Sequence, residues 1–140
     1  MTRIATEYII GSLVSRAASQ LSGVKVFGDT ENPDVTGSTK WVHLTVEHTD
    51  LPSRDGDWIG EGRMIADINA REQLNNIYSS AALAEDLTVA FRNAVVVTDG
   101  GSNTKGVVVF DEKPVSRSLG LTGGILSHYW EGRFKVYTTS

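Results

Sequence analysis

Histidines, carboxylates and serines are the side chains in this sequence that could carry chemistry. A metal site needs ligands that converge, but His43 and His48 differ in parity along one predicted strand and therefore point to opposite faces. His128 does not fall at a metal-ligand spacing from either of them. We therefore expect no metal site built from histidine.

Carboxylates on predicted strands could supply a general acid and a general base. A pair drawn from Glu47, Asp67 and Glu131 is geometrically possible, although nothing else in the sequence supports it. Asp67 lies mid-strand, so it is either a buried catalytic carboxylate or an outward group that could pair across a subunit boundary. We favour the outward interpretation, because unpaired carboxylates are seldom buried.

Nucleophile and nucleotide motifs are absent from the sequence. There is no nucleophile elbow and no Gly-Lys-Ser/Thr loop, and the glycine turn at 99–101 has the wrong order of strand and helix for a phosphate site. The acidic residues Asp29, Glu31 and Asp34 do not have the spacing of an EF-hand loop, so we interpret them as a solvated loop. The sequence predicts neither an enzyme nor a cofactor.

The elements that would position any site are organised around residues 80–91, the clearest helix in the chain. Leu83, Leu87 and Phe91 recur at i, i+4 and i+8, and Ser80 is expected to cap the first turn. Burial of this stripe alone does not offset the conformational entropy lost by ordering the backbone. The helix therefore needs an apolar sheet beneath it.

A second amphipathic helix is predicted over residues 1–22, with Thr2 as N-cap and Gly23 as the C-terminal stop. Its apolar stripe contains Ile9, Leu13, Ala17 and Leu21. The polar face is rich in serine and lacks the basic stripe of a membrane-surface helix, so we expect this helix to dock on the sheet.

Six strands are predicted, at 24–28, 40–49, 63–71, 95–98, 106–117 and 125–138. The last is the longest, and its alternation predicts one helix-facing side, formed by Leu126, His128, Trp130, Phe134 and Val136. Pro114 indicates an edge position or a bulge, and residues 118–124 are interpreted as a flexible joint. Residues 72–79 are either a short helix or irregular. The predicted fold class is α+β: a mixed, largely antiparallel β-sheet packed by two main α-helices, with extended hairpin loops.

Length and composition predict one folded domain over residues 1–140. Of the 140 residues, 40% are hydrophobic and 21% charged, and the net charge is −4. No cluster of Lys and Arg exceeds a pair, which argues against sequence-specific DNA binding through a basic face. No apolar run approaches the roughly 18 residues of a membrane span, and polar residues interrupt the N-terminal stretch too often for a signal peptide. The absence of cysteine excludes disulfides and fits a reducing cytoplasm.

Residues 50–62 are the longest connector, expected to form a hairpin arm between antiparallel strands. Trp58 and Ile59 lie in this polar arm without enough apolar neighbours to bury them locally. Trp58 is therefore either an interface anchor or folds back onto its own sheet.

The order of these elements resembles the tail terminator proteins of long-tailed bacteriophages, which cap the tail tube. The matching segments, in chain order, are VKVFGDTENP, WVHLTVEHT, GRMIADINA, AALAEDLTVAF, GVVVFDEKPVSRSLG and HYWEGRFKVY. The resemblance covers nearly the whole chain. It consists of order, spacing and a few aromatic and glycine positions. The Ser-rich first helix and the segment DGGSNTKG before Gly106 are departures from that pattern.

The resemblance implies a homo-hexameric ring bound to the last ring of the tail tube. Such a ring stops subunit addition, presents a surface to the head-tail connector and lets genomic DNA pass without specific binding, so it needs no catalysis and no cofactor. The protein would occur in the virion tail or neck, and in the host cytoplasm during assembly. Two arms, 29–39 and 50–62, would contact the tube or a neighbour, and the expected interaction residues are Trp58, Ile59, Asp55, Asp57, Arg54, Glu31 and Asp34. Six copies carry 6 × −4 = −24 formal charges, from which we expect an acidic lumen that repels DNA.

Two other functions remain open at this stage. Another neck, head-completion or tail-tube component would share the assembly role but would bind the tail tube poorly. A small hydrolase or ligand-binding domain would instead show a deep pocket with converging polar groups.

Overall fold

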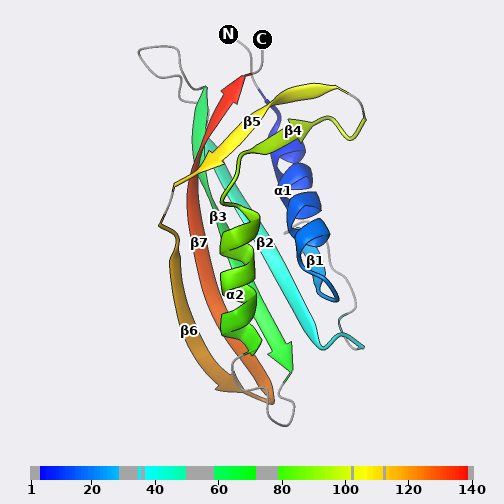
Figure 1. The fold of residues 1–140 in the computed structure, drawn as a ribbon, viewed down its shortest axis with the longest axis vertical. Coiled ribbons are helices and arrows are strands. Elements are labelled where there is room, and N and C mark those ends of the chain that lie inside the picture. Colours follow the sequence, from blue (N-terminus) through cyan, green and yellow to red (C-terminus); the bar gives the residue numbers. More distant parts are fainter. Residues whose placement is uncertain are drawn as a thin grey trace.

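The structure, a computed structural model, describes residues 4–28, 35, 37–49, 59–71, 79–101, 103–111 and 113–138. These residues form an α+β fold in which two helices pack on a curled, largely antiparallel seven-stranded sheet, as the sequence predicts (Figure 1). The elements are α1 (Thr6–Gln20), β1 (Lys25–Gly28), β2 (Lys40–Thr49), β3 (Gly60–Arg71), α2 (Ser79–Ala90), β4 (Val95–Thr98), β5 (Thr104–Phe110), β6 (Val115–Thr122) and β7 (Ile125–Thr138). None of the described helices is long and apolar enough to cross a membrane.

Strand β7 is the centre of the sheet, whose main path runs β1-β2-β3-β7-β5-β4. One side of β7 pairs with β3 along the length of that strand, from 125 to 136. The other side is shared, because β6 pairs with residues 125–131 and β5 with residues 134–138. Among the described strand pairs, β1 with β2 is the parallel one. Beyond β7 the sheet therefore divides into an upper part, in which β5 is followed by the edge strand β4, and a lower part that ends in the edge strand β6 (Figure 1).

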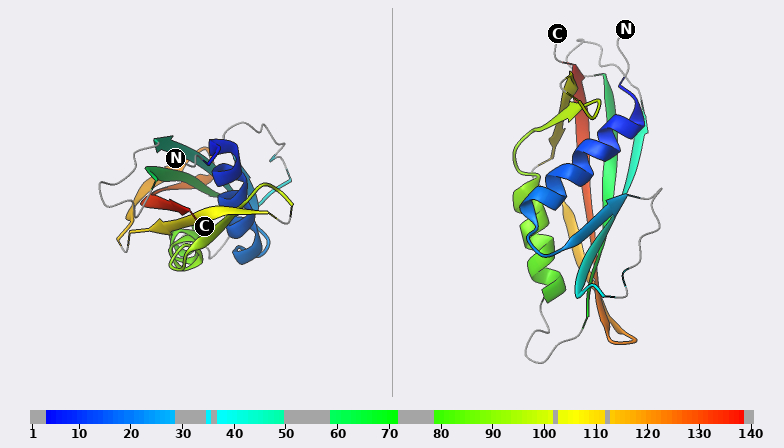
Figure 2. Two further views of the ribbon diagram at one scale, coloured as in Figure 1. Left: turned by 90° about the horizontal axis from the view of Figure 1, so that it is seen from above. Right: turned by 90° about the vertical axis from the view of Figure 1, so that its right-hand side faces the viewer.

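Both helices lie on one face of the sheet (Figures 1 and 2). The even-numbered residues within 42–46 of β2, 64–70 of β3 and 128–136 of β7 point toward the helices and are buried there, as the period-two alternation predicts. The helical stripes predicted from Leu83 and Leu87, and from Ile9 and Leu13, enter the same core. The indole N–H of Trp130 donates to Thr88 Oγ1 at 2.9 Å, so the largest core side chain satisfies its one polar group.

An aromatic cluster closes the core where β5 and β6 meet beside β7. Phe110 lies between Phe91 and Phe134, with ring centroids 5.0 and 5.3 Å away. Gly132 is required at this point, because a Cβ there would lie 2.5 Å from the Trp130 ring and 2.9 Å from that of Phe110.

Helix α1 also covers the outer edge of β4. The Thr98 N–H donates to Ser12 Oγ at 3.1 Å, and Arg16 donates to the carbonyls of Ala90 and Ala94 at 3.2 and 3.1 Å. These bonds tie the first helix to the segment that leaves α2.

The predicted helix starts are wrong at both helices. Helix α1 begins at Thr6, and its N-cap is Ala5, which makes no side-chain capping bond. Thr2 is therefore not the cap, and the first turn bonds instead through Tyr8 N–H to Ala5 O at 3.0 Å. Helix α2 begins at Ser79, so Ser80 lies within its first turn and is buried there.

The predicted strand 106–117 is in fact two strands. Strand β5 ends at Phe110 and β6 begins at Val115, with Pro114, which has no N–H to donate, in the break. Residues 118–124 are not a flexible joint, because β6 continues to Thr122 and turns through Gly123 and Gly124, both with positive φ, into β7. The other predicted strands are confirmed, although β3 begins three residues early, at Gly60.

Candidate interaction surface

The second face of the sheet is covered by neither helix, and we call it the open face. It carries the odd-numbered residues of β1, β2, β3 and β7, together with their partners on β6. Its cationic side chains are Lys25, Arg63, Arg71, Arg117, Arg133 and Lys135, and its carboxylates are Glu47, Glu61, Asp67 and Glu131. Six cations against four carboxylates give this face a formal charge of +2 and leave −6 for the rest of the chain.

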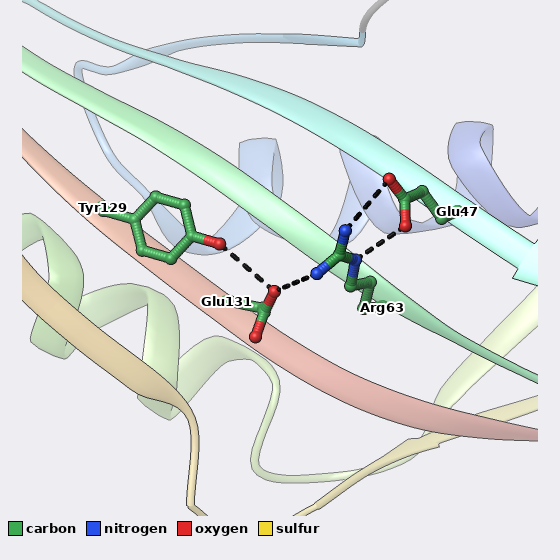
Figure 3. A network of polar contacts seen from close by, with 4 residues as sticks. All are labelled: Glu47, Arg63, Tyr129 and Glu131. Atoms are coloured by element: carbon green, nitrogen blue, oxygen red, sulfur yellow. Dashed lines mark hydrogen bonds and ion pairs between the residues drawn. The ribbon is translucent and has the colours of Figure 1, made fainter.

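A polar network crosses the middle of the open face (Figure 3). Pairing of β2 with β3 puts Glu47 opposite Arg63, and the guanidinium donates to both carboxylate oxygens, at 2.7 and 3.2 Å. The third donor, Arg63 Nη1, reaches Glu131 Oε1 at 2.8 Å, and Tyr129 Oη donates to the same oxygen at 3.2 Å. Glu47 and Glu131, the candidate acid and base of the sequence analysis, therefore both accept hydrogen bonds from the same arginine, Arg63.

Three members of the network, Glu47, Arg63 and Tyr129, have shifted pKa values. Hydrogen bonding to Arg63 lowers the pKa of Glu47, and the same bond raises the pKa of Arg63. The pKa of Tyr129 is raised, first by desolvation and then by its bond to Glu131. These shifts hold Glu47, Arg63 and Tyr129 in their ordinary charge states at neutral pH, which suits a structural contact better than proton transfer.

A second cluster lies beside the network, on β1, β2 and β3. His43 Nδ1 is 3.9 Å from Asp67 Oδ2, and the Phe27 ring stacks on the imidazole with centroids 5.0 Å apart. The Asp67 side chain is 54% exposed, in agreement with its interpretation as an outward carboxylate. These residues border a shallow depression of about 310 Å³ that also contains Asn69 and Ser127.

The three histidines do not come together. His43 is on the open face, His48 Nδ1 lies 3.4 Å from Thr6 Oγ1, and His128 is buried on the helix-facing side. Within the described ranges, no group of three or more His, Asp or Glu side chains could hold a metal ion.

One serine does contact a histidine, which the sequence did not indicate. Ser116 Oγ lies 2.6 Å from His128 Nε2, across the β6–β7 ladder. Burial lowers the pKa of His128, and its Nδ1 has no hydrogen-bond partner among the described residues. Among the described residues, no acidic group orients this imidazole as in a catalytic triad.

The interaction residues predicted from the sequence lie mostly outside the described residues. These are Trp58, Arg54, Asp55, Asp57, Glu31 and Asp34. Ile59 is described. Its N–H donates to Val136 O at 2.8 Å and its side chain, half-buried, packs against the core of its own chain.

The most exposed strand of the structure is β6. All eight of its residues are exposed, and Val115, Leu119 and Leu121 have 52%, 53% and 50% of their surface accessible. The alternation V-S-R-S-L-G-L-T could have signalled a strand, but its two leucines flank a glycine and suggest a joint. The structure thus adds an exposed edge strand, with three partly exposed apolar side chains, as a second candidate interaction surface.

Comparisons with known proteins inform on the fold alone. No protein-family model matches the sequence, and no curated protein matches it. A solved structure whose name describes no function matches 99% of this chain and 99% of its own, with a TM-score of 0.69 and 12% sequence identity. At that identity the similarity concerns the arrangement of the chain.

Proposed function

We propose that this chain is a structural virion subunit that caps the phage tail tube as a hexameric ring. In this role it ends tube polymerisation and offers the head-tail connector a different surface. A growing tube exposes binding surface at its end, and a ring that satisfies this surface on one side only stops growth. The function requires shape and contact rather than a reaction.

The observation that carries the proposal is the surface that the fold leaves without cover. Sheet edges of this kind are normally shortened, charged or covered, because they invite pairing with other chains. Here the described residues cover the β4 edge with α1 but leave an eight-residue strand with three half-exposed apolar side chains. Such an edge is typical of a subunit whose partner is another protein chain.

The order of sequence elements supports the particular assembly. Segments that resemble phage tail terminators extend from the first strand to the last, and their described residues form helix α2 and strands of one sheet. Within this proposal an acidic lumen would have to come from the helix-bearing side or the loops, because the open face carries a formal charge of +2.

Tail-tube assembly in vitro tests the proposal. Tube protein from the same viral genome is polymerised with increasing amounts of this chain, and tube length is measured by electron microscopy. We expect tubes to shorten and each to carry a ring at one end. Tubes of unchanged length, without a terminal ring, would contradict the function. Binding to the head connector without binding to tubes would favour a head-completion protein.

A further inference from the structure

The charges of the open face are divided unevenly between its two halves. The upper half contains residues 45–47, 61–65 and 131–135, and its charged side chains are Arg63, Arg133, Lys135, Glu47, Glu61 and Glu131. The lower half contains residues 25–27, 41–43, 67–71, 117 and 125–129, and its charged side chains are Lys25, Arg71, Arg117 and Asp67. The formal charge is therefore 3 − 3 = 0 in the upper half and 3 − 1 = +2 in the lower half.

Two arginines of the lower half have no carboxylate partner among the described residues. The guanidinium of Arg117 lies over the Tyr129 ring, 5.1 Å from its centroid. That of Arg71 lies over Trp41 at 5.0 Å and donates to two backbone carbonyls. In the upper half, by contrast, Arg63 is bound by carboxylates on both sides. The lower half therefore presents positive charge that a partner with carboxylates can neutralise.

The lower half is also concave. Side chains from β1, β2, β3, β7 and β6 all line the depression of about 310 Å³, so the face is hollowed across five neighbouring strands. Phe27 of β1 and Leu119 of β6 belong to its two margins, and Leu119 is 53% exposed. A convex element that carries a small apolar group at its centre fits such a surface.

The outward side of helix α2 has these properties. Its exposed residues recur at i, i+3, i+4 and i+7 and are Ala82, Glu85, Asp86 and Val89, which we call the acidic stripe. Val89 is 54% exposed, and no ion pair within the described ranges holds either carboxylate. The next exposed charge, Arg92, lies beyond the end of the helix. The acidic stripe thus carries a formal charge of −2, opposite to that of the lower half.

The acidic stripe and the lower half lie on opposite sides of the same strands. Helix α2 packs on β7, β3 and β6 from the covered side, at the level of the lower half (Figure 1). The depression lies on the other side of these strands. A contact between the two surfaces therefore joins the back of one copy to the front of the next. Such a contact is heterologous, and it closes into a ring when the rotation between copies divides a full turn.

We propose that the acidic stripe of one copy docks on the lower half of the open face of the next copy. The carboxylates of Glu85 and Asp86 then meet the positive charge of the lower half, and Val89 enters the depression. The occupant of this face is thus the helix of a second copy, bound in the manner of a helix in a groove. The inference rests on the proposed function, since it assigns the contact that closes the ring.

Charge reversal on the two surfaces tests the contact. Asp86→Arg on α2 and Arg117→Glu on β6 each remove the charge complementarity, and each variant changes every contact of the ring. We therefore expect either variant alone to raise the concentration for half-assembly about tenfold or more, measured by sedimentation.

A mixture of the two variants gives the sharper result. In a ring of six, the variants can alternate, so that every second contact is unmodified and the others bring the two reversed charges together. We expect the equimolar mixture to assemble at a concentration at least about tenfold below that of either variant alone. A mixture that assembles no better than its components, each with native circular dichroism, would overturn the proposal.

Glu7→Arg on α1 is the matched control for charge. Glu7 is an exposed carboxylate on the same side of the sheet as α2, outside the acidic stripe. Its reversal should leave the concentration for half-assembly unchanged. An effect as large as that of Asp86→Arg would mean that overall charge controls assembly, and the assigned contact would be wrong.

The apolar part of the contact has its own test. Val89→Lys on α2 and Val96→Lys on β4 replace valines that are 54% and 50% exposed. Val89→Lys should raise the concentration for half-assembly about tenfold or more, because it places a cation against the cationic lower half, and Val96→Lys should not. Equal assembly of the two variants would exclude Val89 from the contact and overturn the proposal.

The proposed function and the assigned contact can fail separately. If the unmodified chain shortens tail tubes and all variants form free rings as it does, another surface closes the ring and only the contact is lost. If the variants form free rings but no longer bind tubes, the tube protein occupies the lower half, which also overturns the contact. If the unmodified chain neither assembles nor shortens tubes, the proposed function is lost and the contact with it.

Discussion

Trp130 and Tyr129 are consecutive residues of β7, yet they belong to surfaces with different roles. Trp130 is buried on the helix-covered face, where its indole donates to Thr88. Tyr129 lies half-exposed on the open face and donates to Glu131, which also accepts from Arg63. The covered face is held by burial, whose contribution is large, and the open face by ion pairs in water, whose contribution is small. The open face is thus free to change with little effect on folding, which is what an interaction surface requires.

The largest expected effect is loss of the Trp130 side chain. Trp130→Ala removes the largest fully buried side chain and should lower the free energy of unfolding by about 3–5 kcal/mol, measured by urea denaturation. The neighbouring Tyr129→Phe removes only a hydroxyl from the open face and should change it far less. Equal losses in the two variants would contradict the division between the faces.

A smaller effect is expected from adding one methyl group to the covered side. A Cβ at Gly62 would lie 2.1 Å from the Glu47 carbonyl oxygen and 2.7 Å from the Phe134 ring, so Gly62→Ala should cost about 1–3 kcal/mol. Gly11 in the middle of α1 has no heavy atom within 4 Å of the same position. Gly11→Ala should therefore stabilise the protein by about 0.5–1 kcal/mol. Thermal melts of both variants check the opposite signs.

The pH dependence of stability should report on His128, the buried histidine of the covered face. Burial lowers the pKa of His128 from its ordinary value of 6.5, so below that pH the unfolded chain binds the proton more readily than the folded one. The free energy of unfolding should therefore be highest above about pH 6.5 and decrease as the pH falls. His128→Gln should flatten this decrease in urea titrations at several pH values. Parallel profiles for the two proteins would exclude His128 as the cause.

The smallest effect on folding is expected in the open-face network. Arg63→Gln removes the hydrogen bond that lowers the pKa of Glu47, so this pKa should rise toward 4.5. A carbon-13 NMR titration of the carboxyl groups measures the change, and the melting temperature at neutral pH should stay nearly constant. A Glu47 pKa that does not move would show that the carboxylate is stabilised by something other than Arg63.

The covered face could be predicted from the sequence, and the edge strand could not. Alternation of period two identified the buried side of β2, β3 and β7, because every second side chain of these strands points into the core. Strand β6 is exposed along its length and is held as a strand by pairing with β7. That contact does not appear in the local pattern, and Gly120, at φ 86°, suggests a joint instead.

The open-face network was predicted only in its parts. Glu47 and Glu131 were recognised as carboxylates on strands, but their common partner Arg63 depends on the registers of two ladders. A register is set by hairpin geometry and by which face is buried, and a shift of one residue would send Arg63 to the other face. The sequence therefore indicated the residue types of the surface without indicating which of them meet.

The mass of the particle in solution, with and without tail tubes, tests the central claim most directly. Six copies of the 15.2 kDa chain weigh 6 × 15.2 = 91.2 kDa, and we expect this mass, free at high concentration or bound at tube ends, by sedimentation and mass photometry. A 15.2 kDa particle that stays monomeric at every concentration and does not bind tail tubes would contradict the account.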